Sequence, residues 1–221
     1  MSLITLQSVS KIYPPFFKAL ININLEIHKG DFIVLTGSTG AGKTTLLKLI
    51  YGEEKPTSGE IFYRDIPYSK LKNKDFSFFR QNWGIIFQDY KLFSELTVYE
   101  NIKLSLILSK KFVKDIKFRI YEYLERFNIS QKAQKKVREL SGGEQQKVGI
   151  IRAIIKEPEM LIADEPTGNL DPTSINEILE ILKEFNKDGK TIILATHDPV
   201  ILNQNLGKVV KLNRGEMVQD V

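Results

Sequence analysis

A glycine-rich run between an apolar strand and a helix constrains the fold of this chain more than any other feature. The run GSTGAGKT, residues 37–44, fits the pattern G-x-x-x-x-G-K-[S/T]. Its glycines let the backbone curl so that successive N–H groups point at phosphate oxygens, and the following helix adds its positive N-terminal end. The apolar residues 32–36 before it predict a buried strand. The sequence therefore predicts a strand, a phosphate loop and a helix in that order.

The loop assigns nucleotide-binding roles to particular side chains. Lys43 is expected to place its positive charge on the β- and γ-phosphates, and the Thr44 hydroxyl is placed to ligate Mg²⁺. The residues predicted to surround the phosphates of ATP are Gly37, Ser38, Thr39, Gly40, Ala41, Gly42, Lys43, Thr44 and Thr45.

A pair of acidic residues supplies the partner that a phosphate loop needs. The apolar run MLIA, residues 160–163, predicts a buried strand with Asp164 and Glu165 at its carboxyl end, the edge where ligands sit on open α/β sheets. Asp164 is expected on the metal side, and Glu165 is the expected catalytic base or water-positioning residue. An apolar run followed by two acids is common, so this prediction depends on the phosphate loop.

The remaining pattern alternates strands and helices. Strands are predicted on either side of the prolines at 14–15, over 59–63, 83–87 and 191–196, and in a closing hairpin of 209–212 with 217–218. Residues 97–127 read as one helical insertion, opened by the capping-box pair Thr97 and Glu100. We therefore expect an α/β phosphate-loop NTPase core with a mostly parallel sheet, an N-terminal antiparallel β region and an inserted helical subdomain.

Composition narrows the function classes. The 221 residues suit one compact domain, and the absence of cysteine excludes disulfides and thiolate metal sites. Two histidines, His28 and His197, are too few for a histidine metal cluster. The net charge of +5 is compatible with nucleotides, nucleic acid or an anionic membrane, or with solubility alone. No apolar run approaches a membrane span and the N-terminus does not read as a secretory signal, so we expect a chain kept in the cytosol.

A second anion-type motif, LSGGEQQ at residues 140–146, lies about a hundred residues after the first. Ser141 and Glu144 have capping-box spacing, so the simplest interpretation is a well-capped helix. An exposed helix N-terminus is itself an anion site, and both interpretations stay open from the residues alone.

Taken in order, these motifs resemble the ATP-binding subunits of ABC systems over nearly the whole chain. The matching features are Tyr13, GSTGAGKT, Gln88 in GIIFQD, LSGGEQQ, the strand ending in Asp164-Glu165, Asn169-Leu170-Asp171, and His197 in LATHD. The resemblance implies a single ABC domain, 1–221, with an ATP-binding core of 1–90 and 155–221. It also implies a helical subdomain of 91–154 that carries the LSGGEQQ motif.

The resemblance implies a role for each matching residue. Two copies would dimerise head to tail around two ATP molecules, and the LSGGEQQ residues of one copy would face the γ-phosphate held by the other. Tyr13 would stack on adenine, with Phe16 or Phe17 as substitutes. Gln88 would contact Mg²⁺ and the attacking water, His197 would contact the γ-phosphate, and Asp171 would organise the subunit contact. The residues contributed across the dimer would be Ser141, Gly142, Gly143 and Glu144.

Within the family, the stretches TVYENI, ADEPTGNLDP and FNKDGKTIILATHD resemble the cell-division ATPases of the FtsE type. Those ATPases have the membrane partner FtsX and control peptidoglycan hydrolysis. This implies an ATPase attached to the cytoplasmic face of the inner membrane through a similar partner, with Leu92, Phe93, Leu96 and Tyr99 as docking candidates and no direct nucleic acid. The ATPases of lipoprotein-releasing and macrolide- or peptide-exporting transporters are the alternative. A nucleic-acid-stimulated ATPase and an ATP-binding scaffold without turnover stay open as other classes.

Overall fold

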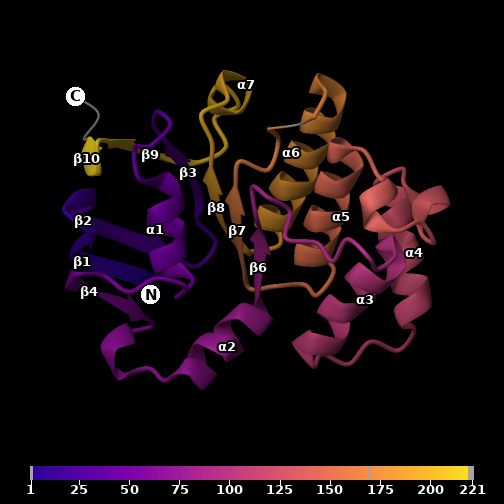
Figure 1. The fold of residues 1–221 in the computed structure, drawn as a ribbon, viewed down its shortest axis with the longest axis horizontal. Helices are drawn as coiled ribbons and strands as arrows, with labels where there is room; N and C mark the ends of the chain where they lie inside the picture. The colour runs from indigo at the N-terminus through magenta and orange to yellow at the C-terminus, as the bar shows by residue number, and fades with distance from the viewer. Residues whose placement is uncertain (1, 169, 219–221) are drawn as a thin grey trace.

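The computed structural model describes residues 2–168 and 170–218, and their strands form two sheets (Figure 1). The larger sheet has the order β10-β9-β3-β8-β7-β6, and all its neighbouring strands are parallel except β9 and β10. Its strands are β3 (Phe32–Thr36), β6 (Trp83–Ile86), β7 (Met160–Asp164), β8 (Thr191–Ala195), β9 (Lys208–Asn213) and β10 (Glu216–Val218). The predicted α/β fold with a mostly parallel sheet is confirmed.

Alternating side chains of these strands enter two different hydrophobic cores. In β7, Met160 and Ile162 pack on one face of the sheet, whereas Leu161 and Ala163 pack on the other. Because successive side chains of a strand point to opposite faces, a strand covered on both sides must be apolar throughout. This explains why the sequence of β7 is an unbroken apolar run that ends at Asp164.

The first core lies between the parallel sheet and a four-stranded antiparallel sheet of order β2-β1-β4-β5. This predicted antiparallel region consists of β1 (Ser2–Tyr13), β2 (Phe17–His28), β4 (Ser58–Tyr63) and β5 (Ile66–Pro67). Two helices, α1 (Lys43–Ile50) and α2 (Asn73–Asn82), bury apolar side chains in the same core. Helix α2 was not predicted, because its run NKDFSFFRQN is mostly polar and is held in place by Phe76 and Phe79.

The second core is covered by helices α3 (Val98–Ser109), α4 (Ile116–Arg126), α5 (Gly142–Ile154) and α6 (Pro172–Lys187). The short helix α7 (Pro199–Leu202) follows β8. Figure 1 shows α3 and α4 at the end of the molecule opposite the antiparallel sheet, with α5 between α4 and α6. These helices share one apolar cluster with α6 and the sheet, so the inserted segment is anchored to the nucleotide core by common packing.

The predicted helical insertion of 97–127 contains two helices, α3 and α4. Lys110 takes a left-handed conformation at the end of α3, with φ of 56°, and the Asp115 side chain accepts a hydrogen bond from the Phe118 amide to start α4. The capping box of Thr97 and Glu100 is confirmed, because the side chain of each accepts a hydrogen bond from the amide of the other. Both helices bury apolar side chains in the second core, so the apolar content of the stretch does not mark the break.

Among the helices that the structure describes, we find none with the length and apolar character needed to cross a membrane.

Candidate nucleotide site

The carboxyl ends of four parallel strands bring the predicted catalytic residues together. The phosphate loop follows β3, Gln88 follows β6, Asp164 and Glu165 lie at the end of β7, and His197 follows β8. They border one cavity of ≈ 220 Å³. Its lining residues are Phe17, Ala19, Thr39, Gly40, Gly42, Lys43, Thr44, Thr45, Gln88, Asp164, Glu165 and His197.

Three of the predicted loop residues, Gly37, Ser38 and Ala41, are not part of this lining.

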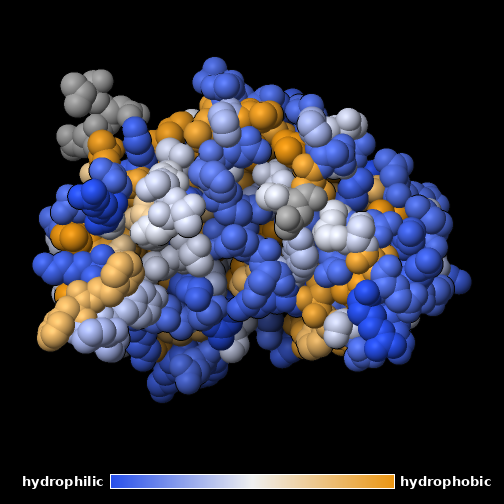
Figure 2. All heavy atoms as spheres, turned by 45° about the horizontal axis from the view of Figure 1, so that its top comes forward, coloured by the Kyte–Doolittle hydropathy of each residue, from blue (hydrophilic) through white to orange (hydrophobic). Residues whose placement is uncertain are grey.

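Figure 2 turns this side of the molecule toward the viewer and shows a mainly hydrophilic surface with separate apolar patches. The sequence therefore located most of the cavity wall, from segments that lie up to about 180 residues apart in the chain.

Two glycines of the phosphate loop sit where no other residue fits. Gly37 has φ of 149°, and a Cβ there would lie 2.3 Å from the Leu212 carbonyl oxygen of β9. Gly42 has φ of 108°, and its Cβ would lie 2.6 Å from the Ala19 carbonyl oxygen of β2. The loop is therefore pressed against strands of both sheets, and this close approach requires glycine.

Lys43 is buried at the start of α1, and its ammonium group lies inside the loop. The Lys43 Nζ donates to the Gly37 carbonyl oxygen at 2.8 Å and to that of Ser38 at 3.4 Å. A lysine held among backbone carbonyls in this way is fixed in position, so its charge points at the centre of the loop.

Glu165 links Lys43 to His197. Its Oε1 lies 3.5 Å from the Lys43 Nζ and 2.7 Å from the His197 Nδ1. The Glu165 backbone has φ of 46°, and its amide donates to the Ala195 carbonyl oxygen at 2.9 Å. Left-handed backbone at a bulky residue is sparsely populated and clusters at functional sites. Here it turns the carboxylate out of β7 into the cavity.

Asp164 is the buried acid of the site. Burial raises the pKa of its carboxyl group, while a hydrogen bond from the Thr44 hydroxyl works against that rise. Its Oδ1 has no hydrogen-bond partner within residues 2–168 and 170–218. A buried carboxylate oxygen without a partner, beside a threonine hydroxyl, fits a hard cation such as Mg²⁺, which binds proteins through one or two oxygen ligands and otherwise through phosphates and water.

The residue predicted to stack on adenine, Tyr13, does not line the cavity. Tyr13 pairs with Phe17 across the β1–β2 hairpin, but the cavity is lined by Phe17 and not by Tyr13. The Lys11 Nζ lies 4.9 Å from the centre of the Tyr13 ring. Phe17, whose side chain is 60% exposed, is therefore the hairpin aromatic that the structure brings to the phosphate loop.

The LSGGEQQ residues lie away from this cavity. Ser141 and Glu144 form the capping box at the start of α5, with hydrogen bonds of 2.9 and 3.3 Å. None of residues 141–144 lines the cavity. In Figure 1, α1 lies on one side of the labels β8 and β7, and α5 lies on the other. The motif therefore caps a helix outside the cavity of its own chain.

Asp171 also lies outside the cavity and begins a helix. Its carboxylate accepts hydrogen bonds from the Ser174 amide at 3.0 Å and the Ser174 hydroxyl at 2.6 Å, which caps α6. Asn169, the first residue of the predicted Asn-Leu-Asp run, lies outside the described residues.

Arg152 holds the segment that follows Gln88, from a position that the motifs do not mark. From α5, its guanidinium donates to the carbonyl oxygens of Tyr90 and Lys91, the former at 2.7 Å. These carbonyls lie two and three residues after Gln88. The signal in the sequence was an arginine inside the otherwise apolar run GIIRAII, residues 149–155, where a buried charge requires partners.

Comparisons with known proteins agree with this geometry. The family model for ABC transporters matches residues 20–168. The cell division ATP-binding protein FtsE of Bacillus subtilis is 41% identical over 99% of this chain and 96% of its own length. FtsE of Escherichia coli K12 is 40% identical over 97% of both chains.

Solved structures extend the agreement to the fold. A dimeric post-hydrolysis structure of the ATP-binding cassette MJ0796, bound to ADP and Pi, superposes with a TM-score of 0.90 and 34% identity, covering 98% of this chain and 97% of that one. CbiO1 of Clostridium perfringens, from the ABC transporter complex cbiONQ, superposes with a TM-score of 0.82 and 32% identity, covering 99% of this chain and 87% of that one. The fold that carries the phosphate loop and the acidic strand end is thus shared with solved ABC cassettes. The chain is a member of the ABC transporter ATP-binding family and, within it, is similar to the FtsE proteins.

Proposed function

We propose that this chain hydrolyses ATP with Lys43, Glu165 and His197 as the reacting-site residues. The observation that carries this assignment is their convergence in one cavity, with Glu165 bonded to His197 and in ionic contact with Lys43. Lys43 holds the β- and γ-phosphates, Glu165 accepts the hydrogen bond of the attacking water, and His197 fixes the Glu165 carboxylate and reaches the γ-phosphate.

Mg²⁺ would neutralise negative charge on the phosphate oxygens of the bound nucleotide. Thr44 and Asp164 would hold it, with Gln88 reaching the same region from the end of β6. When the Lys43 ammonium pairs with phosphate, the Glu165 carboxylate loses its contact with Lys43 and keeps its hydrogen bond to His197. Nucleotide binding thereby frees one side of the Glu165 carboxylate to accept a hydrogen bond from the attacking water.

The active unit is a homodimer that encloses two ATP molecules. The capped N-terminus of α5 has the exposed Ser141, yet it does not line the cavity of its own chain. In a head-to-tail pair, residues Ser141 to Glu144 of one copy complete the phosphate site of the other, using the helix N-terminus as an anion site. Asp171, at the start of α6, would lie at the same subunit contact. The dimeric MJ0796 structures support this assembly.

A membrane protein similar to FtsX is the proposed partner, and segment 92–107 is the proposed docking region. The ring of Phe93 is 58% exposed although its backbone is fixed. The buried Asn101 side chain accepts from the Phe93 N–H at 2.9 Å and donates to the Phe93 carbonyl oxygen at 3.0 Å. Nearby, α3 carries a shallow groove of ≈ 260 Å³, whose lining residues are Leu96, Glu100, Lys103, Leu104 and Ile107.

The other docking candidates contribute differently. Leu92 and Tyr99 are partly buried against the second core. They therefore fix the position of the docking region and offer less surface to the partner than Phe93 does. Docking here would place the 91–154 segment, as a helical subdomain, between the partner and the nucleotide core of 1–90 and 155–221. ATP-driven movement would then control peptidoglycan hydrolysis in cell division, from the cytoplasmic face of the inner membrane and without nucleic acid. The similarity to FtsE proteins supports this role.

Purification of tagged Glu165→Gln protein from native membranes tests the proposal. This variant keeps Lys43 and the loop, so it should bind ATP without turnover and accumulate as the ATP-bound dimer with its partner. Lys43→Ala is the matched control, which should fail to form that dimer because the phosphates lose their cation. Recovery of a membrane protein of the FtsX type supports the cell-division role. A lipoprotein-releasing or export partner would keep the ATPase and refute that role.

A further inference from the structure

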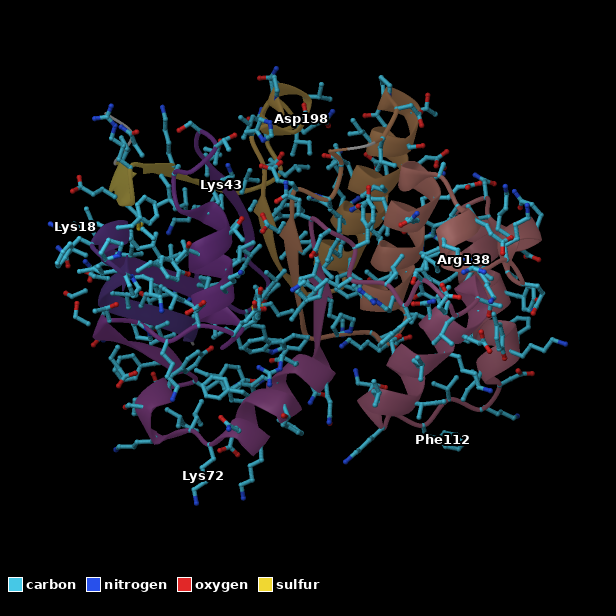
Figure 3. The ribbon with its side chains drawn as sticks, in the orientation of Figure 1. Lys18, Lys43, Lys72, Phe112, Arg138 and Asp198 are labelled. Atoms are coloured by element: carbon cyan, nitrogen blue, oxygen red, sulfur yellow. The ribbon has the colours of Figure 1, made fainter. Side chains whose placement is uncertain are left out.

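The junction between α3 and α4 carries apolar and cationic side chains that the ATPase reaction does not use. We define the tip as residues 107–118, which run from the last turn of α3 into the first turn of α4. Four of its large apolar side chains are exposed, to 52% at Ile107, 62% at Leu108, 93% at Phe112 and 70% at Phe118. In Figure 3 the labelled Phe112 lies at the lower edge of the molecule, far from Lys43.

The exposed apolar residues are not the result of a loose loop. Val113 and Ile116 of the same segment pack against the second core. The Lys111 Nζ donates to the carbonyl oxygens of Lys156 at 2.9 Å and Glu157 at 2.7 Å, which ties the tip to the end of α5. The inward residues therefore fix the segment and hold Phe112 outward. An exposed aromatic ring on a segment that is fixed by packing is typical of a contact surface.

Positive charge predominates around Phe112, because the tip contains four lysines and one acid. No ion pair among the described residues includes Lys110, Lys114 or Lys117. The one acid of the tip, Asp115, has its Oδ1 bonded to the Phe118 amide as a helix cap. Within the part of the chain that the structure describes, three lysines without acidic partners thus flank an exposed aromatic ring.

We propose that the tip binds directly to the surface of an anionic lipid bilayer. Aromatic and aliphatic side chains that enter the interface, flanked by lysines that attract acidic headgroups, are what such a surface recognises. The tip is short and its apolar residues do not form a spanning element, so the contact is peripheral and reversible. It adds a second attachment to the membrane, beside the proposed partner protein, and does not depend on ATP or on that partner.

Sedimentation with lipid vesicles tests this with the full-length chain alone. Vesicles of phosphatidylcholine with about one third phosphatidylglycerol should bind the protein, and pure phosphatidylcholine should bind it far less. Phe112→Ser should weaken binding about tenfold, because a phenyl ring no longer enters the interface. Lys110→Gln with Lys114→Gln should weaken it by a similar factor or more and reduce its dependence on salt.

A matched control removes the same charge elsewhere. Lys18→Gln with Lys208→Gln, on β2 and β9, should leave vesicle binding nearly unchanged, and both pairs should unfold at the wild-type temperature. If both double variants lost vesicle binding equally, net charge alone would explain the binding, and the proposal would be overturned. Absence of vesicle binding would overturn it as well, and if Phe112→Ser then lost a membrane protein partner, the tip would be a protein contact.

Discussion

Replacing one glycine of the phosphate loop should destabilise the protein much more than replacing its neighbour two positions away. Gly40 has φ of 80° and a Cβ there would meet no atom within 4 Å. Gly42 has φ of 108°, and its Cβ would lie 2.6 Å from the Ala19 carbonyl oxygen and 2.8 Å from Leu20 Cδ2. Gly40→Ala and Gly42→Ala therefore add the same methyl group to backbone of positive φ. They differ in the free space around that methyl group.

The difference between the two variants follows from these contacts. Alanine in a left-handed conformation costs about 1–2 kcal/mol at either position. The Gly→Ala change also reduces the freedom of the unfolded chain by about the same amount in both variants, so this term cancels in the comparison. Gly42→Ala adds a clash with backbone that cannot rotate away, for which overpacking suggests a further ~2 kcal/mol.

Urea denaturation measures this difference. For a denaturant slope of about 2 kcal/mol per molar, the midpoint of Gly42→Ala should lie about 1 M below that of Gly40→Ala. Equal midpoints for the two variants would show that the loop and β2 separate without cost. In that case, the close approach of the loop to Ala19 would not be the reason for glycine at this position.

Three further outcomes are expected. Asp164→Asn should raise the Mg²⁺ concentration for half-maximal turnover about tenfold or more, measured by titration at fixed ATP, because one metal-side oxygen loses its charge; an unchanged Mg²⁺ dependence would remove Asp164 from the metal side. Phe93→Asp should abolish co-purification with the membrane partner while nucleotide binding is retained, and loss of both would show that Phe93 supports the fold. Burial, assisted by the charges of Lys111 and Arg152, lowers the pKa of Lys156 to about 8. The unfolded chain therefore binds that proton more tightly, and the free energy of unfolding should rise with pH from about 8 to about 10. Lys156→Met should flatten this rise in urea titrations, and an unchanged slope would contradict the assignment.

The catalytic end of the sheet could be predicted from the sequence because its signals are local. The glycine spacing of 37–44 fixes a loop geometry by itself, and the apolar run 160–163 locates Asp164 and Glu165 at a strand end. Parallel strands then place their carboxyl ends at one edge, so the meeting of Glu165 with His197 follows from topology. The roles of these residues in catalysis stay predictions until they are measured.

Other features depend on contacts that a single sequence does not display. The break at Lys110 is a left-handed backbone conformation at a lysine, and neither glycine nor proline marks it in the sequence. Helix α2 is too polar to be recognised before Phe76 and Phe79 are seen to join the first core. The choice between Tyr13 and Phe17 beside the loop depends on how the hairpin lies against the loop, which the alternation of residues 3–27 does not determine.

The grip of Arg152 on the backbone that follows Gln88 has a mechanical consequence. Helix α5 has 13 residues and is therefore about 20 Å long. Ser141 caps one end of it, and Arg152 near the other end holds the carbonyls of Tyr90 and Lys91, just before Phe93. In the proposed assembly, α5 would act as a rigid rod between the dimer contact and the docking region. A tilt of this rod by about 5° moves one end by about 1–2 Å relative to the other, by simple geometry of a rod of that length. If the membrane partner docks at Phe93 as proposed, its movement would reach Ser141 as a displacement comparable to the difference between a made and a broken hydrogen bond.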